Sequence, residues 1–303
     1  HPVAHSFPTR RSSDLSLVDA TPVRQPNGGQ SPLDDSDDTP ADASLEACSA
    51  VVAVSAQELA AESEFVISLG GDGTLLYAAG LLCESVVPVL GVHMGTLGFL
   101  TQFQEAELDA AVDAALKGEL VREERMRLQT VIRRQGKPPV TGTAANDVVL
   151  SQGKMARLLE LDVYMDGSFM TSYRADGLIL GTPTGSTAYN LAAGGPIINP
   201  GVDALVLTPI CPHSLTQRPT VLPSTGKLSV VVGDSGQGAF VTIDGQSGEI
   251  LSPGDHVEVS RSRHPLVLFR SPKRSFFDIL RTKLMWGEGA LKSLPRASGE
   301  GTP

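Results

Sequence analysis

Residues 70–74, GGDGT, place one carboxylate inside a glycine-rich turn. The glycines let the backbone turn sharply and approach a ligand without a Cβ clash. The turn follows an apolar run and precedes a helical pattern, so its N–H groups would face phosphate oxygens. Asp72 would repel phosphate there unless it binds a divalent cation or accepts a proton from an attacking hydroxyl. An ordinary tight turn is the alternative, and the P-loop pattern is absent because no Gly-Lys-Ser/Thr follows. The candidate phosphate loop is Gly70, Gly71, Gly73 and Thr74.

A second candidate site is residues 173–200, YRADGLILGTPTGSTAYNLAAGGPIINP, where glycine, threonine, serine and proline are concentrated. This composition also fits a long surface loop. However, its hydroxyls, backbone amides and one stacking ring suit a nucleotide. Asp176, Thr187 and Tyr189 are close enough in sequence to contact a ribose, an amide and a base.

The elements before residue 124 alternate between strand and helix patterns. Apolar, β-branched runs at 51–55, 65–71 and 86–93 predict strands, and 74–85 and 105–120 predict helices. Alternation of this kind predicts an α/β fold, with a Rossmann-like parallel sheet over 46–124 and ligand sites at the carboxyl ends of its strands.

The remainder of the chain has a different pattern. Short strand patterns separated by turn residues predict a β-rich domain over 125–271. Residues 272–303 contain a final helix and a tail, with Phe276, Phe277, Ile279 and Leu280 as the apolar face of the helix. We expect this helix to pack back on the N-terminal domain.

Residues 1–45 are rich in Pro, Ser, Gly and Asp and have no sustained apolar period, so we expect them to be disordered. Residues 6–15, SFPTRRSSDL, also resemble the translation of a common DNA-sequencing adaptor. We therefore expect this N-terminus to be partly non-native, and the α/β sheet to lack its first strand.

Composition argues against several classes of protein. A formal net charge of −10 disfavours nucleic acid and membrane surfaces as partners. No apolar run reaches the ~18 residues of a transmembrane helix. The 3 cysteines have no paired spacing, which indicates neither a disulfide framework nor a zinc site and favours a cytoplasmic setting.

Five segments resemble the ATP-NAD kinase family in order and spacing. They are GGDGT at 70–74, AND at 145–147, the 173–200 block, PICPHSLTQRP at 209–219 and TIDGQ at 242–246. The resemblance covers about residues 50–290. It implies transfer of the γ-phosphoryl group of ATP, with a divalent ion such as Mg²⁺, to the 2′-hydroxyl of the adenosine ribose of NAD. The products would be NADP and ADP, and the assembly a homodimer or homotetramer.

Matched position by position, the resemblance implies roles for individual residues. Asp72 would be the proton acceptor, and Asp72 and Gly73 would also contact NAD. Asn146 and Asp147 would bind the ribose and adenine. The resemblance also implies NAD-site positions at Arg157, Arg174, Asp176, Thr184, Thr187, Ala188, Tyr189, Asn190, Leu191, Ala192 and Gln246, partly across a subunit contact. No protein side chain is assigned as a metal ligand.

Two other functions remain as alternatives. GGDGT also occurs in diacylglycerol and sphingosine kinases, but a lipid kinase needs an apolar slot that the polar segment TPTGSTAYN does not provide. A non-catalytic NAD-binding module would gain nothing from a carboxylate beside phosphates. A mixture of the protein with ATP, Mg²⁺ and NAD, assayed for NADP, distinguishes the three.

Overall fold

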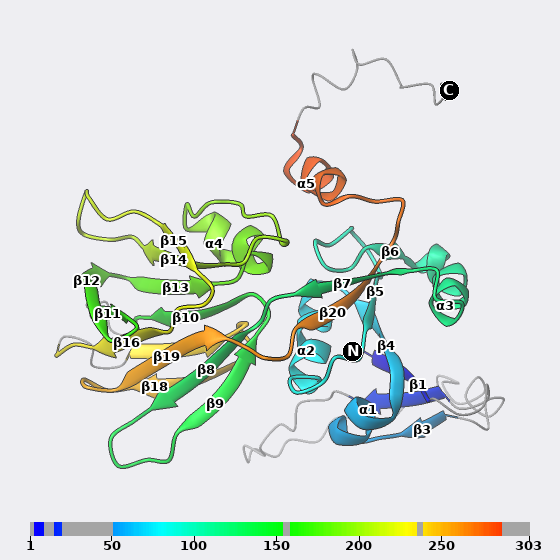
Figure 1. The fold of residues 1–303 in the computed structure, drawn as a ribbon, viewed down its shortest axis with the longest axis horizontal. Coiled ribbons are helices and arrows are strands. Elements are labelled where there is room, and N and C mark those ends of the chain that lie inside the picture. Colours follow the sequence, from blue (N-terminus) through cyan, green and yellow to red (C-terminus); the bar gives the residue numbers. More distant parts are fainter. Residues whose placement is uncertain (1–2, 9–14, 20–50, 154–157, 235–238, 287–303) are drawn as a thin grey trace, which may run out of the picture.

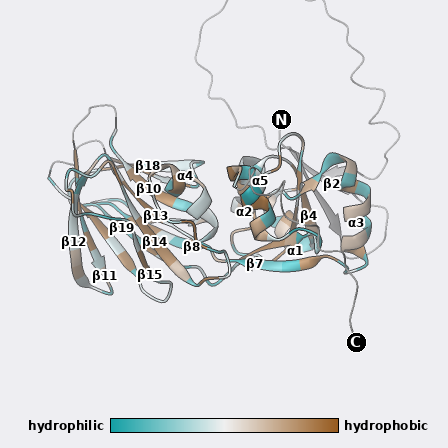
Figure 2. Ribbon diagram, turned by 90° about the horizontal axis from the view of Figure 1, so that it is seen from above, coloured by the Kyte–Doolittle hydropathy of each residue, from teal (hydrophilic) through white to brown (hydrophobic). Residues whose placement is uncertain are grey.

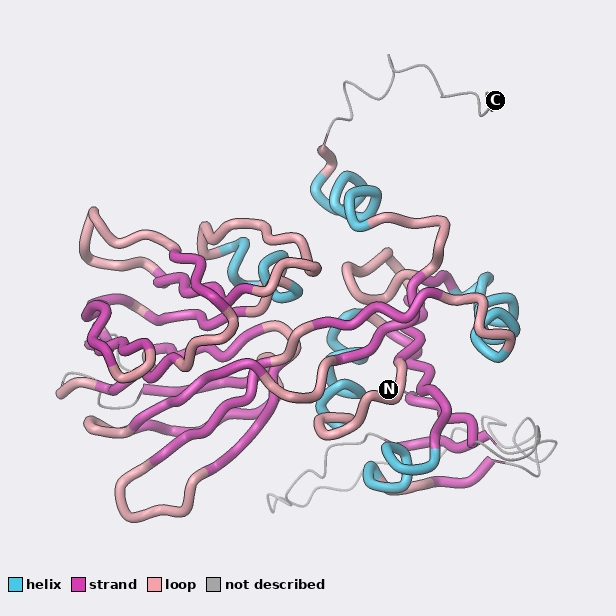
Figure 3. Tube along the Cα trace, viewed as in Figure 1, coloured by secondary structure: helices cyan, strands magenta, loops and turns pink. Residues whose placement is uncertain are grey.

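The computed structural model describes residues 3–8, 15–19, 51–153, 158–234 and 239–286, which form two lobes (Figure 1). The N-terminal lobe combines the chain up to residue 125 with the returning segment 266–286, and the C-terminal lobe holds 128–261. The chain crosses between the lobes twice, as the trace in Figure 3 shows. The two crossings are linked by a 2.8 Å hydrogen bond from the Ser262 N–H to the Arg127 carbonyl.

The N-terminal lobe is built on an eight-stranded sheet in the order β3-β2-β1-β4-β5-β20-β7, with β6 beside β5. Its centre is parallel, because β5 pairs in parallel with β4, β20 and β6, whereas β1 and β7 pair antiparallel with their neighbours. The strands are β1 (Val3–Pro8), β2 (Leu15–Asp19), β3 (Val51–Ala53), β4 (Ser63–Gly70), β5 (Val89–His93), β6 (Phe103–Gln104), β7 (Val121–Arg125) and β20 (Leu266–Arg270).

Helices cover both faces of this sheet. They are α1 (Ala56–Glu62), α2 (Asp72–Leu81) and α3 (Leu108–Leu116), with the short 3₁₀ turn η1 (Glu105–Glu107) before α3. Successive residues of β4 point to opposite faces, so Val66 packs with Leu75 of α2, while Phe65 and Ile67 pack with Ala111 of α3. Burial on both faces explains the continuous apolar run of β4.

The C-terminal lobe is a sandwich of two six-stranded antiparallel sheets, in the orders β15-β14-β13-β10-β17-β18 and β12-β11-β16-β19-β8-β9. Side chains of both sheets, such as Leu161 and Leu178, form one core between them. The strands are β8 (Leu128–Arg133), β9 (Val140–Ala144), β10 (Asp147–Ser151), β11 (Leu159–Met165), β12 (Ser168–Ala175), β13 (Gly177–Gly181), β14 (Ala204–Ile210), β15 (Thr220–Pro223), β16 (Leu228–Val232), β17 (Ala239–Ile243), β18 (Ser247–Leu251) and β19 (His256–Arg261). Between β13 and β14 lie the 3₁₀ turn η2 (Thr184–Thr187) and the short helix α4 (Tyr189–Ala192).

The predicted fold class is confirmed, with four corrections. Disorder over 1–45 is wrong for β1 and β2, because β1 pairs with the edge of β4 through backbone hydrogen bonds that need no apolar period. The rest of that range lies outside the described residues. The sheet is mixed rather than wholly parallel, and β20, expected in the 125–271 domain, completes it. The polar strand β7, at the edge of this sheet, is visible as a teal segment in Figure 2.

The final helix α5 (Phe276–Leu284) packs back on the N-terminal lobe, as expected. It begins with a capping box in which Ser275 and Asp278 satisfy each other's backbone N–H groups. Ile279 and Leu280 are buried, but Phe277 is 57% exposed. Phe277 is therefore not part of the buried face of the helix, where the sequence pattern had placed it. The fourth correction is therefore a narrower apolar stripe on α5, formed by Ile279 and Leu280 without Phe277.

Leu75→Ala should lower the free energy of unfolding by about 2–5 kcal/mol, because it removes a fully buried side chain between α2 and the sheet and leaves a cavity. Leu116→Ala makes the same chemical change at an exposed position of α3 and serves as the control. Denaturant unfolding measures both. An equal effect of the two substitutions would contradict the burial of Leu75 between α2 and the sheet.

Candidate active site

Asp72 is the first residue of α2, and its carboxylate is held by a neighbouring loop. Oδ2 accepts the Phe99 N–H at 2.8 Å, and Oδ1 accepts the Leu100 and Thr101 N–H groups, each at 3.0 Å. The Thr101 hydroxyl also donates to Oδ1, at 3.1 Å. Four donors on one carboxylate fix its position and orientation relative to the glycine-rich turn.

Two glycines make this arrangement possible. A Cβ at Gly98 would lie 2.0 Å from Oδ1 of Asp72, so no other residue leaves room for the carboxylate. Gly70 has φ +152°, and a Cβ there would lie 2.3 Å from Oγ1 of Thr74. The phosphate-loop candidates therefore lie at a tight strand-to-helix turn, with α2 beginning at Asp72.

A second carboxylate, that of Asp244, holds the backbone of the C-terminal lobe just before β10. Asp244 accepts the N–H groups of three consecutive residues, Ala145 at 2.7 Å, Asn146 at 2.8 Å and Asp147 at 3.0 Å. Asp244 and Gly245 have φ +50° and +65°, which form the tight turn after β17. This turn places Gln246 so that its amide donates to the Gly73 carbonyl at 3.1 Å. The two lobes thus meet at the residues that the sequence singled out.

A cavity of about 390 Å³ opens on the C-terminal lobe beside this turn. It extends along one face of β10 and reaches the loop before α4. Its lining residues are Asn146, Asp147, Val149, Ser151, Ala188, Tyr189, Thr242, Asp244 and Gly245. Tyr189 is 47% exposed and offers a ring face to a planar group. Four of the sequence-predicted residues therefore share one cavity.

The electrostatics of the cavity centre on two adjacent carboxyl groups. Burial, together with the nearby Asp244, raises the pKa of Asp147 to about 7. Burial also raises the pKa of Asp244, against the three backbone N–H donors that favour its ionised form. Because those donors stabilise the Asp244 carboxylate, Asp147 is the member of the pair that holds a proton near neutral pH.

The segment after β13 is fixed mainly by its own polar groups. The Thr182 hydroxyl donates to the Ala145 carbonyl at 2.6 Å, and a Cβ at Gly185 would lie 2.2 Å from the Asn146 carbonyl oxygen. Asn190 is fully buried, donating to the Ser186 and Pro196 carbonyls and accepting from Thr208. Its side chain therefore holds the loop rather than facing the cavity.

The remaining predicted residues are placed less centrally. Thr184 and Thr187 belong to η2, where the Thr187 hydroxyl donates to the Thr184 carbonyl at 3.3 Å. Leu191 and Ala192 belong to α4. Arg174 is exposed near the end of β12, and Asp176 follows that strand, so both lie at the Ser151 end of β10. Arg157 lies outside the described residues.

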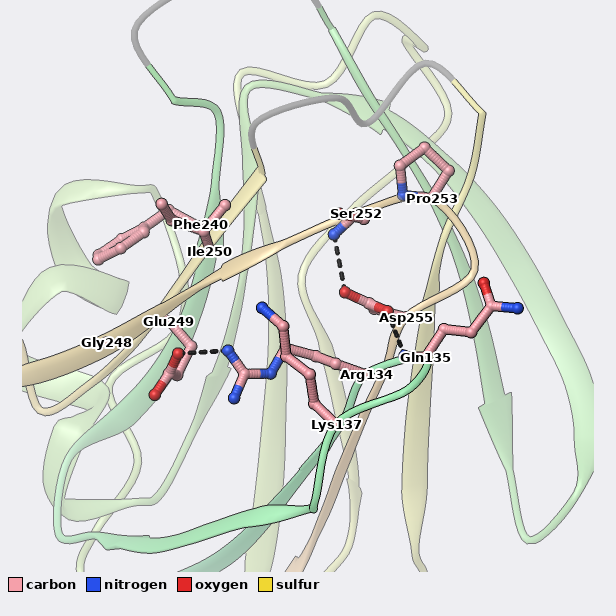
Figure 4. Close-up of a pocket in the computed structure, with 10 residues that line it drawn as sticks. All are labelled: Arg134, Gln135, Lys137, Phe240, Gly248, Glu249, Ile250, Ser252, Pro253 and Asp255. Carbon is pink, nitrogen blue, oxygen red and sulfur yellow. Dashed lines mark hydrogen bonds and ion pairs between the residues drawn. The ribbon is translucent and has the colours of Figure 1, made fainter.

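Two further hollows of about 600 Å³ each lie outside this cavity. One is lined by His93, Met94 and Gly95 at the end of β5, and it lies near the candidate phosphate loop, because His93 pairs with Gly70 in the sheet. The other lies in the C-terminal lobe (Figure 4). There Arg134 pairs with Glu249 at 2.5 Å, and Asp255 accepts the Gln135 and Ser252 N–H groups. None of the predicted site residues lines this last hollow.

The sequence interpretation missed the loop 94–101 and Asp244. Two signals were available: Gly95 and Gly98 follow a buried strand, as the glycines of the phosphate loop do, and Asp244 lies inside the motif TIDGQ. Within the described ranges, no group of three or more His, Cys, Asp and Glu side chains could hold a metal ion. Cys83 and Cys211 are free thiols. No described helix is long and apolar enough to span a membrane.

Comparison with known families gives two matches along the chain. Residues 22–120 match the ATP-NAD kinase N-terminal domain, and residues 145–271 match the ATP-NAD kinase C-terminal domain. An NAD kinase of Syntrophotalea carbinolica is 44% identical over 225 residues, which cover 74% of this chain and 79% of that protein. An NAD kinase of Koribacter versatilis is 45% identical over 225 residues, with coverages of 74% and 79%.

Two solved structures share the fold. The yeast NADH kinase complexed with NADH superimposes with a TM-score of 0.73 and 31% identity, covering 82% of this chain and 72% of that one. An NAD kinase from Archaeoglobus fulgidus in complex with ATP gives a TM-score of 0.65 and 26% identity, covering 76% of this chain and 89% of that one.

Asp147→Asn should change how stability depends on pH. The pKa of Asp147 is raised from its usual 3.8 to about 7, so between these values the folded state holds a proton that the unfolded state has lost. Stability due to this group therefore falls as pH rises, by about 2–4 kcal/mol across that window, and is then constant. Asparagine, which resembles the neutral acid, should remove this decline.

Denaturant unfolding at several pH values between 4 and 8 measures the difference between the variant and the wild type. The variant should gain relative stability as pH rises. Asp109→Asn, at an exposed carboxylate of α3, is the matched control and should show no such gain. Parallel curves for the wild type and Asp147→Asn would contradict a neutral Asp147.

Proposed function

The chain belongs to the ATP-NAD kinase family and acts as an NAD kinase, and we propose that Asp72 is its proton acceptor. The observation that carries this assignment is the carboxylate of Asp72, held in place inside the glycine-rich turn. Gln246 of the C-terminal lobe, which holds the cavity, bonds to the same turn at Gly73. The reaction moves the γ-phosphoryl group of ATP to the 2′-hydroxyl of the adenosine ribose of NAD. The proton leaves that hydroxyl, and ADP and NADP are the products.

The hydrogen bonds of Asp72 indicate which of its oxygens acts. Oδ1 accepts three donors, from Leu100 N and from Thr101 N and Oγ1, which leave it no free lone pair. Oδ2 accepts only the Phe99 N–H and retains a lone pair. We therefore assign Oδ2 to orient the ribose hydroxyl and to take its proton late in the transfer, when the new P–O bond has formed. Phosphoryl transfer needs mainly this positioning and charge neutralisation.

The two hollows that border the phosphate loop suit the two substrates. The cavity with Asn146, Asp147 and Tyr189 offers hydrogen-bonding groups and a ring face to the adenosine of NAD. Protonated Asp147 can donate a hydrogen bond as well as accept one. The hollow at His93, Met94 and Gly95 lies near Gly70 and would take ATP. Backbone N–H groups at the start of α2 would then face the transferred phosphate.

A divalent ion, expected to be Mg²⁺, would accompany ATP. Mg²⁺ usually keeps several waters and binds through substrate phosphates with one or two carboxylates. Backbone N–H groups at the start of α2 would hold the phosphates that carry the ion, and no side chain is assigned to the ion itself. When bound, the ion would neutralise charge on the phosphates. We propose a cytoplasmic location on the basis of the unpaired cysteines.

The alternative functions fit the site less well. A lipid kinase needs a slot for acyl chains, whereas this cavity holds two carboxyl groups, those of Asp147 and Asp244, together with the amide of Asn146. A non-catalytic binding module does not account for a carboxylate held by four donors with one lone pair free.

Asp72→Asn should lower the rate of NADP formation by at least about 100-fold, the scale of lost general-base catalysis. NAD binding should change little, because the cavity residues stay in place. The measurement is NADP production from ATP, Mg²⁺ and NAD, with NAD affinity determined separately by calorimetry.

Asp109→Asn controls for the loss of a negative charge and should keep the wild-type rate. The amide introduced by Asp72→Asn cannot satisfy all four donors, so some loss of stability is expected from an unpaired buried group, about 1–3 kcal/mol. Activity is therefore compared at a temperature where both variants are folded. Near-normal turnover by Asp72→Asn would remove Asp72 from the mechanism.

We also propose a homodimer or homotetramer in which Arg174 and Asp176 approach the NAD site of a neighbouring subunit. Arg174 is exposed and lies beyond the cavity of its own chain, at the Ser151 end of β10. Light scattering should give a mass of at least twice 31.8 kDa. Arg174→Glu should weaken NAD binding or the assembly by reversing the charge at the contact. A fully active monomer would refute this arrangement.

A further inference from the structure

We infer that Arg274, at the start of the C-terminal helix, is a positioning residue for Asp72. This inference rests on the proposed role of Asp72. Arg274 lies two residues before α5, in the segment that leaves β20 and runs to the helix near β6 (Figure 1). It contacts the loop that holds the Asp72 carboxylate, although the two residues are far apart in sequence.

Arg274 makes two kinds of contact with this loop. Its Nη1 donates to the carbonyl of Gln102, the residue directly after Thr101. Its Nη2 lies 3.1 Å from both carboxylate oxygens of Glu107, at the end of η1. The arginine is itself held, because Arg270 donates to its carbonyl at 2.9 Å. The Arg274 side chain thus holds the C-terminal end of the loop at two residues, Gln102 and Glu107.

The helix also contacts the entry of the same loop. Nζ of Lys283 lies 5.8 Å from the centre of the Phe99 ring, within the range of a cation–π interaction. Phe99 and Thr101 are the first and last of the three residues whose N–H groups bind Asp72. The C-terminal segment therefore contacts the loop at Phe99, the first of these three residues, and at Gln102, the residue after the last of them.

This geometry couples the C-terminal segment to the reacting group. The Gln102 carbonyl lies one peptide beyond Thr101, so a shift of this carbonyl moves the donors on Oδ1 of Asp72. A misplacement of about 1 Å in a reacting group can cost about 100-fold in rate. In contrast, the Arg274–Glu107 pair is partly exposed, and such pairs contribute little to stability. Loss of Arg274 should therefore affect the rate far more than it affects folding.

The test is steady-state kinetics of the full chain with ATP, Mg²⁺ and NAD. Arg274→Met should lower kcat by about 10- to 100-fold, with little change in the KM for NAD or in the unfolding midpoint. Arg274→Lys retains a cation and one donor and should recover part of the rate. Arg281→Met is the matched control, since it removes a nearby arginine, within α5, whose ion-pair partner Asp278 belongs to the same helix and not to the loop at Asp72.

A second comparison shows whether Arg274 acts through Asp72. In an Asp72→Asn background, Arg274→Met should lower the residual rate no further, because residues acting as a unit are not additive. If Arg274→Met fails to fold, Glu107→Gln weakens the same contact from the other side and should lower kcat in the same direction.

The outcomes separate the two proposals. A normal kcat for Arg274→Met, or an equal loss in Arg281→Met, with Asp72→Asn inactive, overturns the positioning role and leaves the role of Asp72 intact. An active Asp72→Asn overturns the proposed mechanism itself. A further multiplicative loss in the double variant shows that Arg274 acts independently of Asp72 and also rejects the inference.

Discussion

The Asp72 carboxylate, with its four hydrogen-bond donors, is the constraint around which the N-terminal lobe is arranged. Three consecutive N–H groups can converge on one carboxylate only if the loop after β5 lies against the start of α2. That contact requires Gly98, whose missing Cβ leaves space for Oδ1, and the parallel alignment of β4 and β5, which places both strand ends at one edge. The conformation of the loop and the position of the Asp72 carboxylate are therefore set by the same hydrogen bonds.

The C-terminal lobe contains a similar arrangement, in which one carboxylate holds a loop through consecutive backbone N–H groups. Asp244 also accepts three consecutive N–H groups, and it thereby fixes the turn that carries Asn146 and Asp147. Two buried carboxylates side by side cannot both ionise cheaply, so the ionised Asp244 leaves Asp147 neutral near pH 7. A neutral acid can donate to an acceptor on the nucleotide, which an ionised one cannot.

Local patterns predicted the elements and the residues that flank the site. The apolar run of β4 and its terminal glycines predicted the tight strand-to-helix turn, and the motifs around Asn146 and Tyr189 contribute residues that line the cavity. Three features escaped prediction because they depend on contacts between distant segments: the partners of Asp72 at 99–101, the three donors to Asp244, and the return of β20 into the first sheet. The sequence predicts Asn190 as a residue of the NAD site, and the structure adds that its amide donates to the carbonyls of Ser186 and Pro196, contacts that a motif cannot reveal.

The hydrogen bonds of α2 explain how both lobes hold one geometry. Its N-terminus carries Asp72, and its C-terminal carbonyls of Ala79 and Leu82 accept Nη1 of Arg127, which is 1% exposed in the crossing to β8. A cation suits this end of the helix dipole, and it also attracts Asp244. Burial lowers the pKa of Arg127 to about 10, so the guanidinium stays charged at neutral pH. Rotation of one lobe against the other would break these bonds and leave a buried cation unpaired, which is costly. The distance between the phosphate loop and the cavity is therefore set from both ends of one helix, by Gln246 at one end and Arg127 at the other.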